Sequence, residues 1–397
     1  MQSMIDVYNA NLGGNRLDDD PCHISWTHRL KGYAEKGNRI DFADSSIVLS
    51  AYRPFCKQWL YYSKELNERT YQQPRLFPLN SKIQSNGSPA ALENLVIQTA
   101  GVASSSFSCL IADCVPCYDR LSKGQCFPLY WYEEKEQFGG LFGDELDGYT
   151  RHDAIADETL AVFRAAYPHA FGLVNRRSIE QAKADGLSNK AATSEERFEI
   201  AKVDIFYYIY GILHSPEYRK RFEANLKKEL PRIPLAADFV AFARAGRALA
   251  DLHLNYETVE RWAAIEEEGD SANPGRTVKM AFGKCKKDDH HPKGQDMSVI
   301  KVAENLTLRN IPLEAYDYVV NGRSAIGWLM DRYQVRTDKA SGIMNDPNDY
   351  SDDPRYIVDL VKRVVTVSLS TLEIVHTLPS LNEKPQPADW PLTWKMG

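Results

Sequence analysis

The stretch VDIFYYIYGILHSPEY, residues 203–218, contains the clearest structural signals in this sequence. Its apolar part, 203–213, predicts a buried helix. Ser194 and the acids after it supply a start for that helix, because a hydroxyl and carboxylates suit the free N–H groups of a first helical turn. Ser215-Pro216-Glu217 repeats such a start signal, with proline at the first helical position. We therefore expect a second helix to begin here and to end before Pro231.

Two regions downstream of this stretch also have helical periodicity. An amphipathic helix is expected from about Ala237. Its apolar side consists of Phe239, Phe242, Leu249 and Leu252. Nearer the C-terminus, Ser324 is expected to begin one helix and Asp353-Pro354 the strongest one. The apolar stripe of that last helix consists of Ile357, Val361, Val364, Val365 and Leu372.

In two places the pattern of apolar residues changes from the period of a helix to the alternation typical of a strand. Upstream of the central helices, short aromatic and β-branched runs between turn residues predict strands. These runs are 47–49, 59–62, 95–98 and 127–132. Downstream, apolar and polar residues alternate at 278–282 and, less regularly, at 299–305. We interpret 276–308 as a β-hairpin whose polar tip is 284–296.

These elements predict an α+β fold without an internal repeat. A mixed short-strand region (1–132) is followed by an acidic, glycine-rich connector (133–158), a helical region (159–270), the β-hairpin (271–311) and a C-terminal helical region (312–397). The longest apolar run, 203–213, is about half of the roughly 20 residues that a membrane-spanning helix needs, so no membrane contact is expected.

Composition and charge restrict the class of protein. The chain has 397 residues, of which 43% are hydrophobic and 26% charged, which are ordinary values for a soluble globular protein. Its net charge of −6 argues against a small protein that coats DNA by charge alone, although a local basic face suffices for DNA binding. The seven cysteines lack a regular spacing, and residues 1–20 lack a signal-peptide pattern. We therefore expect free thiols in a reducing cytoplasm.

The sequence lacks the motifs of several catalytic classes. It contains no phosphate-binding glycine loop ending in Gly-Lys-Ser or Gly-Lys-Thr, no Gly-x-Gly-x-x-Gly after a strand, no Gly-x-Ser-x-Gly elbow and no His-Glu-x-x-His helix. Asn345-Asp346-Pro347-Asn348 is the nearest approach to the Asn-Pro-Pro-aromatic motif of amino-methyltransferases, and it lacks the second proline and the aromatic residue. We therefore expect no catalytic centre and no cofactor in this chain.

Three clusters of potential metal ligands have a structural interpretation, which we favour. A group of four cysteines includes one Cys-x-x-Cys but not the second close pair typical of a zinc site, so buried thiols are expected. The group is Cys109, Cys114, Cys117 and Cys126. The acidic stretch 346–353 lacks the glycine and the final glutamate of a calcium loop, and we interpret it as a solvated turn with a helix cap. His290-His291 is expected to be an exposed part of the hairpin tip. No metal is expected.

Two regions have a local excess of basic residues: 216–247 and 276–310 each contain eight Lys or Arg and four acids. Phosphate contacts need cations that project from one face, which a helix edge or a hairpin tip can supply. A third segment, 52–62, combines arginine and lysine with aromatic residues, which read guanine edges or stack on bases. The candidate DNA contacts are Arg53, Lys57, Arg219, Lys220, Lys284, Lys286, Lys287 and Lys293. The competing interpretation is a solvated helix, a polar tip and a core strand.

Several blocks of the sequence together resemble one protein family. They are YRPF running into WLYY (52–62), QCFPLY (125–130), DIFYYIYGILHSPEYR (204–219) followed by PRIPL (231–235), YVVNGRSAIGWLMDRYQV (318–335) and NDPND (345–349). They resemble, in the same order, blocks of the C-terminal target-recognition region of type ISP restriction–modification enzymes and related methylase–helicase fusion proteins. The resemblance extends over about residues 25–378.

The resemblance implies a parent polypeptide with a nuclease, a helicase-like ATPase, a coupler, an adenine N6-methyltransferase and a terminal target-recognition region, to which this chain corresponds. No catalytic residue is carried over, because the catalytic modules of such a parent lie upstream. The expected function is sequence-specific binding of double-stranded DNA, which positions the methyltransferase and helicase–nuclease modules. The alternative is a protein-docking scaffold of the same assembly without DNA binding of its own. An exposed apolar patch on the terminal helix would favour that alternative.

Overall fold

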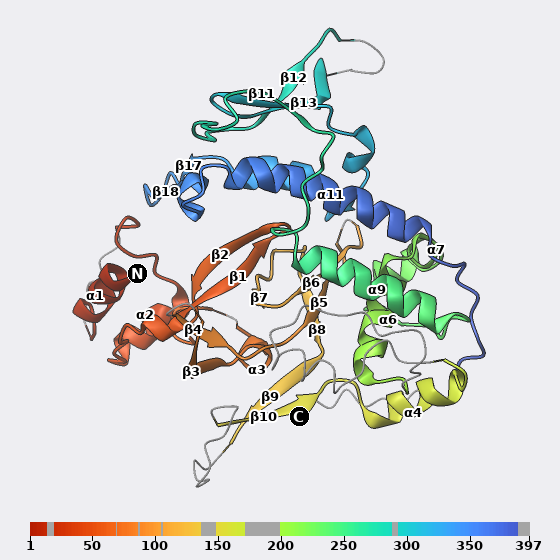
Figure 1. The fold of residues 1–397 in the computed structure, drawn as a ribbon. Coiled ribbons are helices and arrows are strands. Elements are labelled where there is room, and N and C mark those ends of the chain that lie inside the picture. Colours follow the sequence, from red (N-terminus) through yellow and green to blue (C-terminus); the bar gives the residue numbers. More distant parts are fainter. Residues whose placement is uncertain are drawn as a thin grey trace.

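The structure is a computed structural model in which helices and small sheets alternate along the chain (Figure 1). It describes residues 1–13, 20–68, 70–85, 88–104, 106–135, 148–170, 199–287 and 293–387, with only the backbone described at 80–85 and 88–91. The fold is α+β, as the sequence predicts. Ser194, His290-His291 and residues 136–147 of the acidic connector lie outside the described residues.

Two helices at the N-terminus, α1 (Gln2–Ala10) and α2 (His28–Glu35), pack against the first strands. The Thr27 hydroxyl caps α2 by accepting a hydrogen bond from the N–H of Leu30 at 3.2 Å. A short 3-10 helix, η1 (Asp44–Ser46), leads into the first strand. The buried side chains of this small core are Ile5, Tyr8, Ile24, Leu30, Ala34, Ile40 and Tyr61.

Two three-stranded sheets lie at the centre of the molecule. In the first, β1 is antiparallel to β2 and parallel to β7; in the second, β5 lies between β6 and β8 and is antiparallel to both. The bounds are β1 Ile47–Arg53, β2 Cys56–Tyr61, β5 Val96–Thr99, β6 Cys109–Ala112, β7 Val115–Pro116 and β8 Gln125–Pro128. Every residue of β5 and β6 is buried, including the polar Gln98 and Thr99 of β5, so neither strand has a face exposed to solvent.

Smaller elements surround these sheets. They are α3 (Gln73–Leu76), the hairpin of β3 (Leu79–Ser85) and β4 (Ser88–Ala91), the hairpin of β9 (Tyr130–Glu134) and β10 (Tyr149–Asp153), and α4 (Asp157–Ala166). The predicted strands at 47–49, 59–62 and 95–98 are confirmed, and the predicted strand at 127–132 divides between β8 and β9.

The helices α6 (Lys202–His214) and α9 (Phe239–Leu254) pack backbone to backbone on one side of the central sheets (Figure 1). A Cβ atom at Gly246 would lie 1.8 Å from the carbonyl oxygen of Tyr207, and one at Gly211 would lie 2.2 Å from that of Phe242. Only glycine permits such an approach. The sequence VDIFYYIYGILH is therefore apolar on nearly every side because neighbouring elements enclose it.

The start of α6 differs from the sequence prediction. The helix begins at Lys202, and residues 199–201 before it are not helical. The carboxylate of Asp204 accepts a hydrogen bond from the N–H of Ala201 at 2.8 Å, which is one half of a capping box. A buried aspartate inside the apolar run thus supplies the start, a role that sequence reasoning gave to the hydroxyl and acids at 194–196.

The second predicted helix start is confirmed, but the helix is short. The Ser215 hydroxyl accepts from the N–H of Tyr218 at 3.3 Å and caps α7 (Pro216–Arg221), after which the chain bends at Phe222 into α8 (Glu223–Leu226). α9 begins at Phe239 with Asp238 as its cap, close to the predicted start at about Ala237, and α10 (Ala325–Arg332) begins after Ser324, as predicted.

A four-stranded antiparallel sheet with the order β11-β14-β13-β12 forms the top of the molecule in Figure 1. Its strands are β11 (Glu266–Gly269), β12 (Ala281–Lys284), β13 (Gln295–Ala303) and β14 (Leu306–Arg309). β12 and β13 form the predicted hairpin, and the other two strands extend it. The inward side chains of this sheet pack on the terminal helix α11 (Tyr356–His376).

Helix α11 lies between the upper sheet and the central sheets (Figure 1). Its predicted apolar stripe is confirmed, since Ile357, Val361, Val364 and Val365 are buried and Leu372 is half-buried against the same core. The structure describes α11 throughout, and none of the large apolar side chains that are strongly exposed belongs to it. The apolar patch expected of a docking scaffold is therefore absent from this helix.

The remaining short elements flank α10 and α11. They are η2 (Leu313–Tyr316), the strand pairs β15 (Val319–Val320) with β16 (Arg323–Ser324) and β17 (Arg336–Thr337) with β18 (Met344–Asn345), and η3 (Pro347–Tyr350). The acidic stretch contains η3, which the Asp346 carboxylate caps by accepting from the N–H of Asn348. Asp346 is also buried in an ion pair with Arg276, so this part of the stretch is a fixed turn and not a solvated one.

A buried histidine links three helical segments and the chain near β15. His253 of α9 has its Nδ1 2.6 Å from the Tyr210 hydroxyl, and its Nε2 lies 3.0 Å from the hydroxyls of both Thr371 and Tyr318. Burial, assisted by the positive charges of Arg120 and Arg219, lowers the pKa of His253 to about 3. The imidazole is therefore neutral near pH 7 and serves as a hydrogen-bonded junction.

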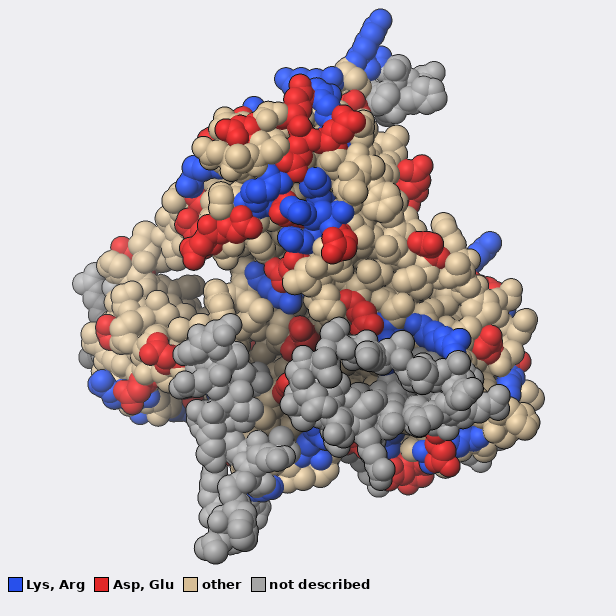
Figure 2. Space-filling model, viewed as in Figure 1, with Lys and Arg blue, Asp and Glu red and all other residues tan. Residues whose placement is uncertain are grey.

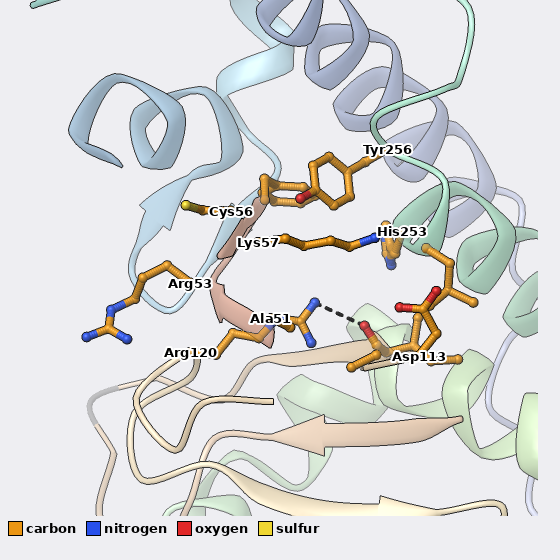
Figure 3. A pocket seen from close by; sticks show the side chains of 12 residues that line it. Ala51, Arg53, Cys56, Lys57, Asp113, Arg120, His253 and Tyr256 are labelled. Atoms are coloured by element: carbon orange, nitrogen blue, oxygen red, sulfur yellow. Dashed lines mark hydrogen bonds between the residues drawn. The ribbon is translucent and has the colours of Figure 1, made fainter. Parts of the chain in front are cut away.

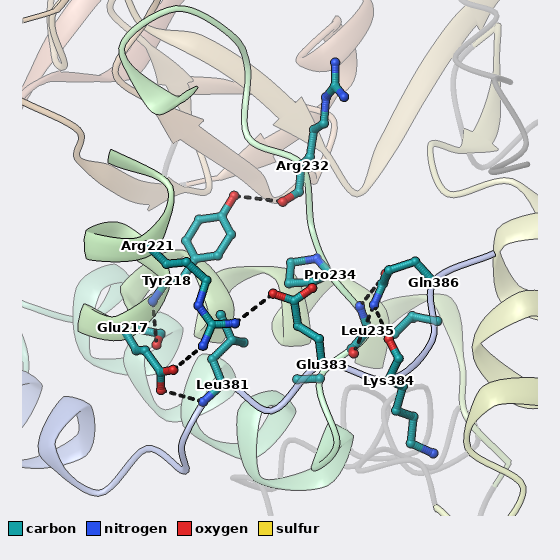
Figure 4. Close-up of polar contacts among 12 residues, drawn as sticks. Glu217, Tyr218, Arg221, Arg232, Pro234, Leu235, Leu381, Glu383, Lys384 and Gln386 are labelled. Atoms are coloured by element: carbon teal, nitrogen blue, oxygen red, sulfur yellow. Dashed lines mark hydrogen bonds and ion pairs between the residues drawn. The ribbon is translucent and has the colours of Figure 1, made fainter. Parts of the chain in front are cut away.

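The segment after α11 continues past α7 (Figure 1) and is held along residues 235–237 (Figure 4). Asn382 accepts from the N–H of Ala237 at 2.6 Å, and the N–H of Lys384 donates to the carbonyl of Leu235 at 2.8 Å. The side chain of Leu381 is 1% exposed. We call residues 378–386 the C-terminal strap. No helix of the described part of the chain is both long and apolar enough to cross a membrane.

Candidate nucleic-acid interface

Four of the predicted DNA contacts lie together at the free end of the β12–β13 hairpin. Lys284 is the last residue of β12, and Lys286, Lys287 and Lys293 follow in the described part of the tip; all four are exposed. Figures 1 and 2 show this hairpin projecting from the molecule with Lys and Arg side chains around it. Exposed ammonium groups on a projecting hairpin suit contacts with phosphates, because they can reach the DNA backbone and displace its counterions.

Backbone contacts hold the base of this tip. The N–H of Cys285 donates to the carbonyl of Gly294 at 3.2 Å, and Gly294 itself has φ +64°, a conformation that favours glycine. The register also shifts between Phe282 and Gly283, which is typical of a β-bulge and increases the local twist. The four lysines therefore project from a hairpin whose base is held by backbone hydrogen bonds. Residues 288–292 of the tip lie outside the described part.

Lys57 lies elsewhere and is engaged within the protein. It points inward from β2, and its Nζ lies 3.5 Å from the Glu257 carboxylate and 5.5 Å from the centre of the Tyr256 ring (Figure 3). Its side chain is only 18% exposed. Contact between this ammonium group and a DNA phosphate would require breaking the ion pair with Glu257.

Arg53 is held at the end of β1. Its guanidinium lies 4.1 Å from the centre of the Tyr52 ring, and Nη1 donates to the Tyr52 carbonyl at 2.8 Å and to the Cys117 sulfur at 3.3 Å. Figure 3 shows its guanidinium pointing away from Lys57, although both residues belong to the same strand pair. The side chains of the two candidates of segment 52–62 therefore point in different directions.

A small cavity lined by both polar and apolar residues lies beside Lys57 (Figure 3). Its volume of about 10 Å³ corresponds to the space of one water molecule. Arg120 lines it and is 5% exposed; its Nη2 donates to the Ile111 carbonyl at 3.0 Å, whereas Nε and Nη1 have no partner among the described residues. This size suits a bridging water and excludes an organic ligand.

Arg219 and Lys220, the remaining candidates, line a larger cavity beside α7. Its volume is about 390 Å³. Nε of Arg219 donates to the Leu213 carbonyl at 2.7 Å, and its guanidinium lies 5.7 Å from the centre of the Phe107 ring. Lys220 is exposed at the rim. Lys227 of the same basic region also lines this cavity. The sequence did not indicate the cavity, because its opposite wall is formed by residues 100–107, which are distant in sequence.

One aromatic side chain of segment 52–62 faces solvent. Trp59 is 69% exposed, next to its cross-strand partner Leu49, which is 36% exposed. Phe55, Tyr61 and Tyr62 are buried, so the core-strand interpretation holds for most of the segment. Successive side chains of a strand point to opposite faces, and this alternation was the only signal in the sequence that could have distinguished Trp59 from its neighbours.

The four clustered cysteines do not converge. Cys109 lies 3.6 Å from a ring nitrogen of the buried His214, whereas Cys117 lies beside Arg53. Burial raises the pKa of Cys109 to about 11 and those of Cys114 and Cys126 to about 12, so these thiols keep their protons near neutral pH. Within the described residues, no group of three or more His, Cys, Asp or Glu side chains is arranged to hold a metal ion.

The chain is similar to a described family and to several solved structures. Residues 1–360 match the family described as "Type ISP C-terminal specificity domain". The ATP-dependent type ISP restriction–modification enzyme LlaBIII bound to DNA is similar with a TM-score of 0.77 and 33% identity, over 97% of this chain and 22% of that one. No match was found among curated proteins.

Two further structures have the same fold over nearly the whole chain. A nuclease-deletion mutant of the type ISP enzyme LlaGI, in complex with a DNA substrate mimic, has a TM-score of 0.72 and 32% identity, over 97% of this chain and 31% of that one. The DrdV–DNA complex has a TM-score of 0.70 and 26% identity, over 95% of this chain and 32% of that one. The chain thus spans less than a third of each of these proteins. Because the family match covers residues 1–360 of 397, the chain belongs to the family of type ISP C-terminal specificity domains.

Proposed function

We propose that this chain recognises a specific sequence in double-stranded DNA and catalyses no reaction itself. The observation that carries the proposal is its family membership, together with its likeness over at least 95% of the chain to proteins whose structures contain DNA. The family's description as a specificity domain supports recognition of a target over general DNA binding. In this role, base edges specify the sequence and phosphate contacts set the position of the protein.

The tip of the β12–β13 hairpin is the proposed phosphate-contacting element. Its four lysines are exposed. They contrast with Lys57, which is paired with Glu257. The partners proposed for the bound state are an adenine N6-methyltransferase and helicase–nuclease modules, which the specificity domain would place on the DNA.

In the first experiment, the purified chain is mixed with a pool of randomised DNA duplexes at moderate salt. The duplexes that it binds are recovered and sequenced. We expect one asymmetric motif to be enriched. Weak, salt-sensitive binding without any enriched motif would contradict autonomous recognition by this chain.

The second experiment tests the hairpin. Replacing Lys284, Lys286, Lys287 and Lys293 by Gln is expected to weaken binding of the selected duplex and to lower the slope of log K against log salt by about 0.9 for each lost phosphate contact. The matched control removes the same charge from exposed lysines elsewhere: Lys31, Lys36, Lys228 and Lys339. Equal effects of the two quadruple variants would show that only net charge matters and would reject the hairpin's role.

A further inference from the structure

The cavity of about 390 Å³ beside α7 has two walls from distant parts of the chain. One wall is the loop between β5 and β6, with Gly101, Ser104 and Phe107; the other is formed by α7 and α8. The N–H of Ala103 donates to the carbonyl of Lys227 at 3.0 Å, which joins the walls at one edge. The volume lies within the range of about 300–1,000 Å³ that is usual for small-molecule sites.

The charges around this cavity favour an anion. Arg219, Lys220 and Lys227 line it, against one acid, Glu223. The ion pair between Lys227 and Glu223 spans 2.7 Å, but both side chains are more than half exposed, so it neutralises little. Among the ion pairs of the described residues, none involves Arg219 or Lys220.

Arg219 is positioned before any ligand arrives. Its Nε is bound to the Leu213 carbonyl, and its Nη2 lies 3.6 Å from the sulfur of Cys109. A guanidinium that is already oriented loses less conformational entropy when it binds a phosphate than a free lysine does. Ser106 also lines the cavity. Its hydroxyl oxygen is buried and has no hydrogen-bond partner among the described residues.

The cavity also has an apolar part and is larger than an inorganic anion needs. Phe107, Leu226, Ala100 and Pro216 line it beside the basic groups. Basic side chains next to an aromatic ring and an aliphatic wall are the combination that binds a phosphate together with its sugar and base.

We propose that this cavity binds a nucleotide phosphate on Arg219 and Lys220, with the attached nucleoside against Phe107 and Leu226. The phosphate can come from a free nucleotide or from a DNA strand; the second source rests on the proposed function, whereas the first is independent of it. Binding here is separate from the phosphate contacts proposed for the β12–β13 hairpin.

The test titrates the full chain with three probes by calorimetry: deoxyadenosine 5′-monophosphate, unphosphorylated deoxyadenosine, and a short single-stranded DNA. Lys220→Glu is compared with Lys228→Glu, which reverses the same charge on an exposed side chain that does not line the cavity. We expect Lys220→Glu to weaken binding of the phosphate-bearing probe by about tenfold or more, and Lys228→Glu to change it less than about twofold. Deoxyadenosine is expected not to bind.

Preference for the monophosphate over the single strand would assign a free nucleotide, and the reverse would assign a DNA strand. Equal weakening by both charge reversals, or no binding of either phosphate-bearing probe, would overturn the proposal. The selected duplex distinguishes the two proposals: the hairpin variant is expected to lose duplex binding while it retains monophosphate binding.

Discussion

At the scale of single residues, the environment of a side chain depends on segments that are distant in sequence. Lys57 and Arg53 have the residue types of DNA contacts, yet Glu257 and Cys117 engage them. Trp59, two residues from Lys57, is the exposed side chain of that strand. Gly246 is another such position, because the carbonyl of Tyr207 on α6 occupies the place where its Cβ would be.

Gly246→Ala is expected to destabilise the protein by about 2 to 3 kcal/mol, because α6 and α9 must move apart to admit the methyl group. The measurement is the free energy of unfolding in urea. Gly32→Ala is the matched control: Gly32 lies inside α2, and no heavy atom lies within 4 Å of its Cβ position. That control is expected to stabilise by up to about 1 kcal/mol through helix propensity. Destabilisation of similar size in both variants would contradict the close-packing explanation.

At the scale of elements, ion pairs attach the upper sheet to α11. The carboxylate of Glu267 on β11 accepts hydrogen bonds from Arg355 and from Lys362, each at 2.9 Å. Asp359 on α11 accepts from Arg355 at 3.0 Å and from Arg261 at 2.9 Å. Because Glu267 is only 14% exposed, removing one partner of this network leaves half-buried charges without compensation, which costs more than breaking a surface ion pair.

The network predicts a pH dependence of stability. Burial alone would raise the pKa of Glu267, but hydrogen bonds from Arg355 and Lys362 lower it from 4.5 to about 2. A lowered pKa in the folded state contributes stability above pH 4.5, and this contribution is lost as the pH falls from there toward 2. Glu267→Gln is therefore expected to cost on the order of 2 kcal/mol at pH 7 and progressively less at lower pH.

The measurement for Glu267→Gln is the unfolding free energy of variant and wild type between pH 7 and pH 3. Glu268→Gln, on the same strand but 59% exposed, serves as the control and is expected to cost less than about 1 kcal/mol at pH 7. A difference between Glu267→Gln and wild type that stays constant over this pH range would show that the ion pairs do not stabilise the folded state.

At the scale of the whole molecule, two large apolar cores meet along α9 and α11. One core contains the inward faces of the upper sheet and α11, together with Phe55 and Leu110 from the first third of the chain. The other surrounds α6 and α9 and includes Leu381. The C-terminal strap therefore runs from α11, in the first core, into the second core. Arg221 forms ion pairs with both Glu217 and Glu383 beside the strap (Figure 4).

Leu381→Ala is expected to destabilise the protein by about 2 to 4 kcal/mol, because it leaves a cavity in the second core. Glu383→Gln, which removes the exposed ion pair with Arg221, is expected to cost less than about 1 kcal/mol. Urea and thermal unfolding of both variants give the comparison. A larger cost for Glu383→Gln than for Leu381→Ala would mean that electrostatic contacts hold the strap.

The sequence by itself determined the elements whose causes are local. Ser215 and Ser324 begin helices because each side chain caps the turn that follows it, and the stripe on α11 follows from helical periodicity. The exposed lysines of the hairpin tip were also predictable, because a polar tip between two strands faces water. The family could be identified because its blocks occur in order along the chain.

Only the tertiary structure decided the rest, because the deciding contacts join residues far apart in sequence. It paired Lys57 with Glu257, separated the four cysteines, and placed Gly211 and Gly246 between two helix backbones. It also brought the 100–107 loop to α7, which creates the cavity around Arg219. Periodicity and spacing describe what one segment favours; burial and charge pairing depend on which distant segment covers it.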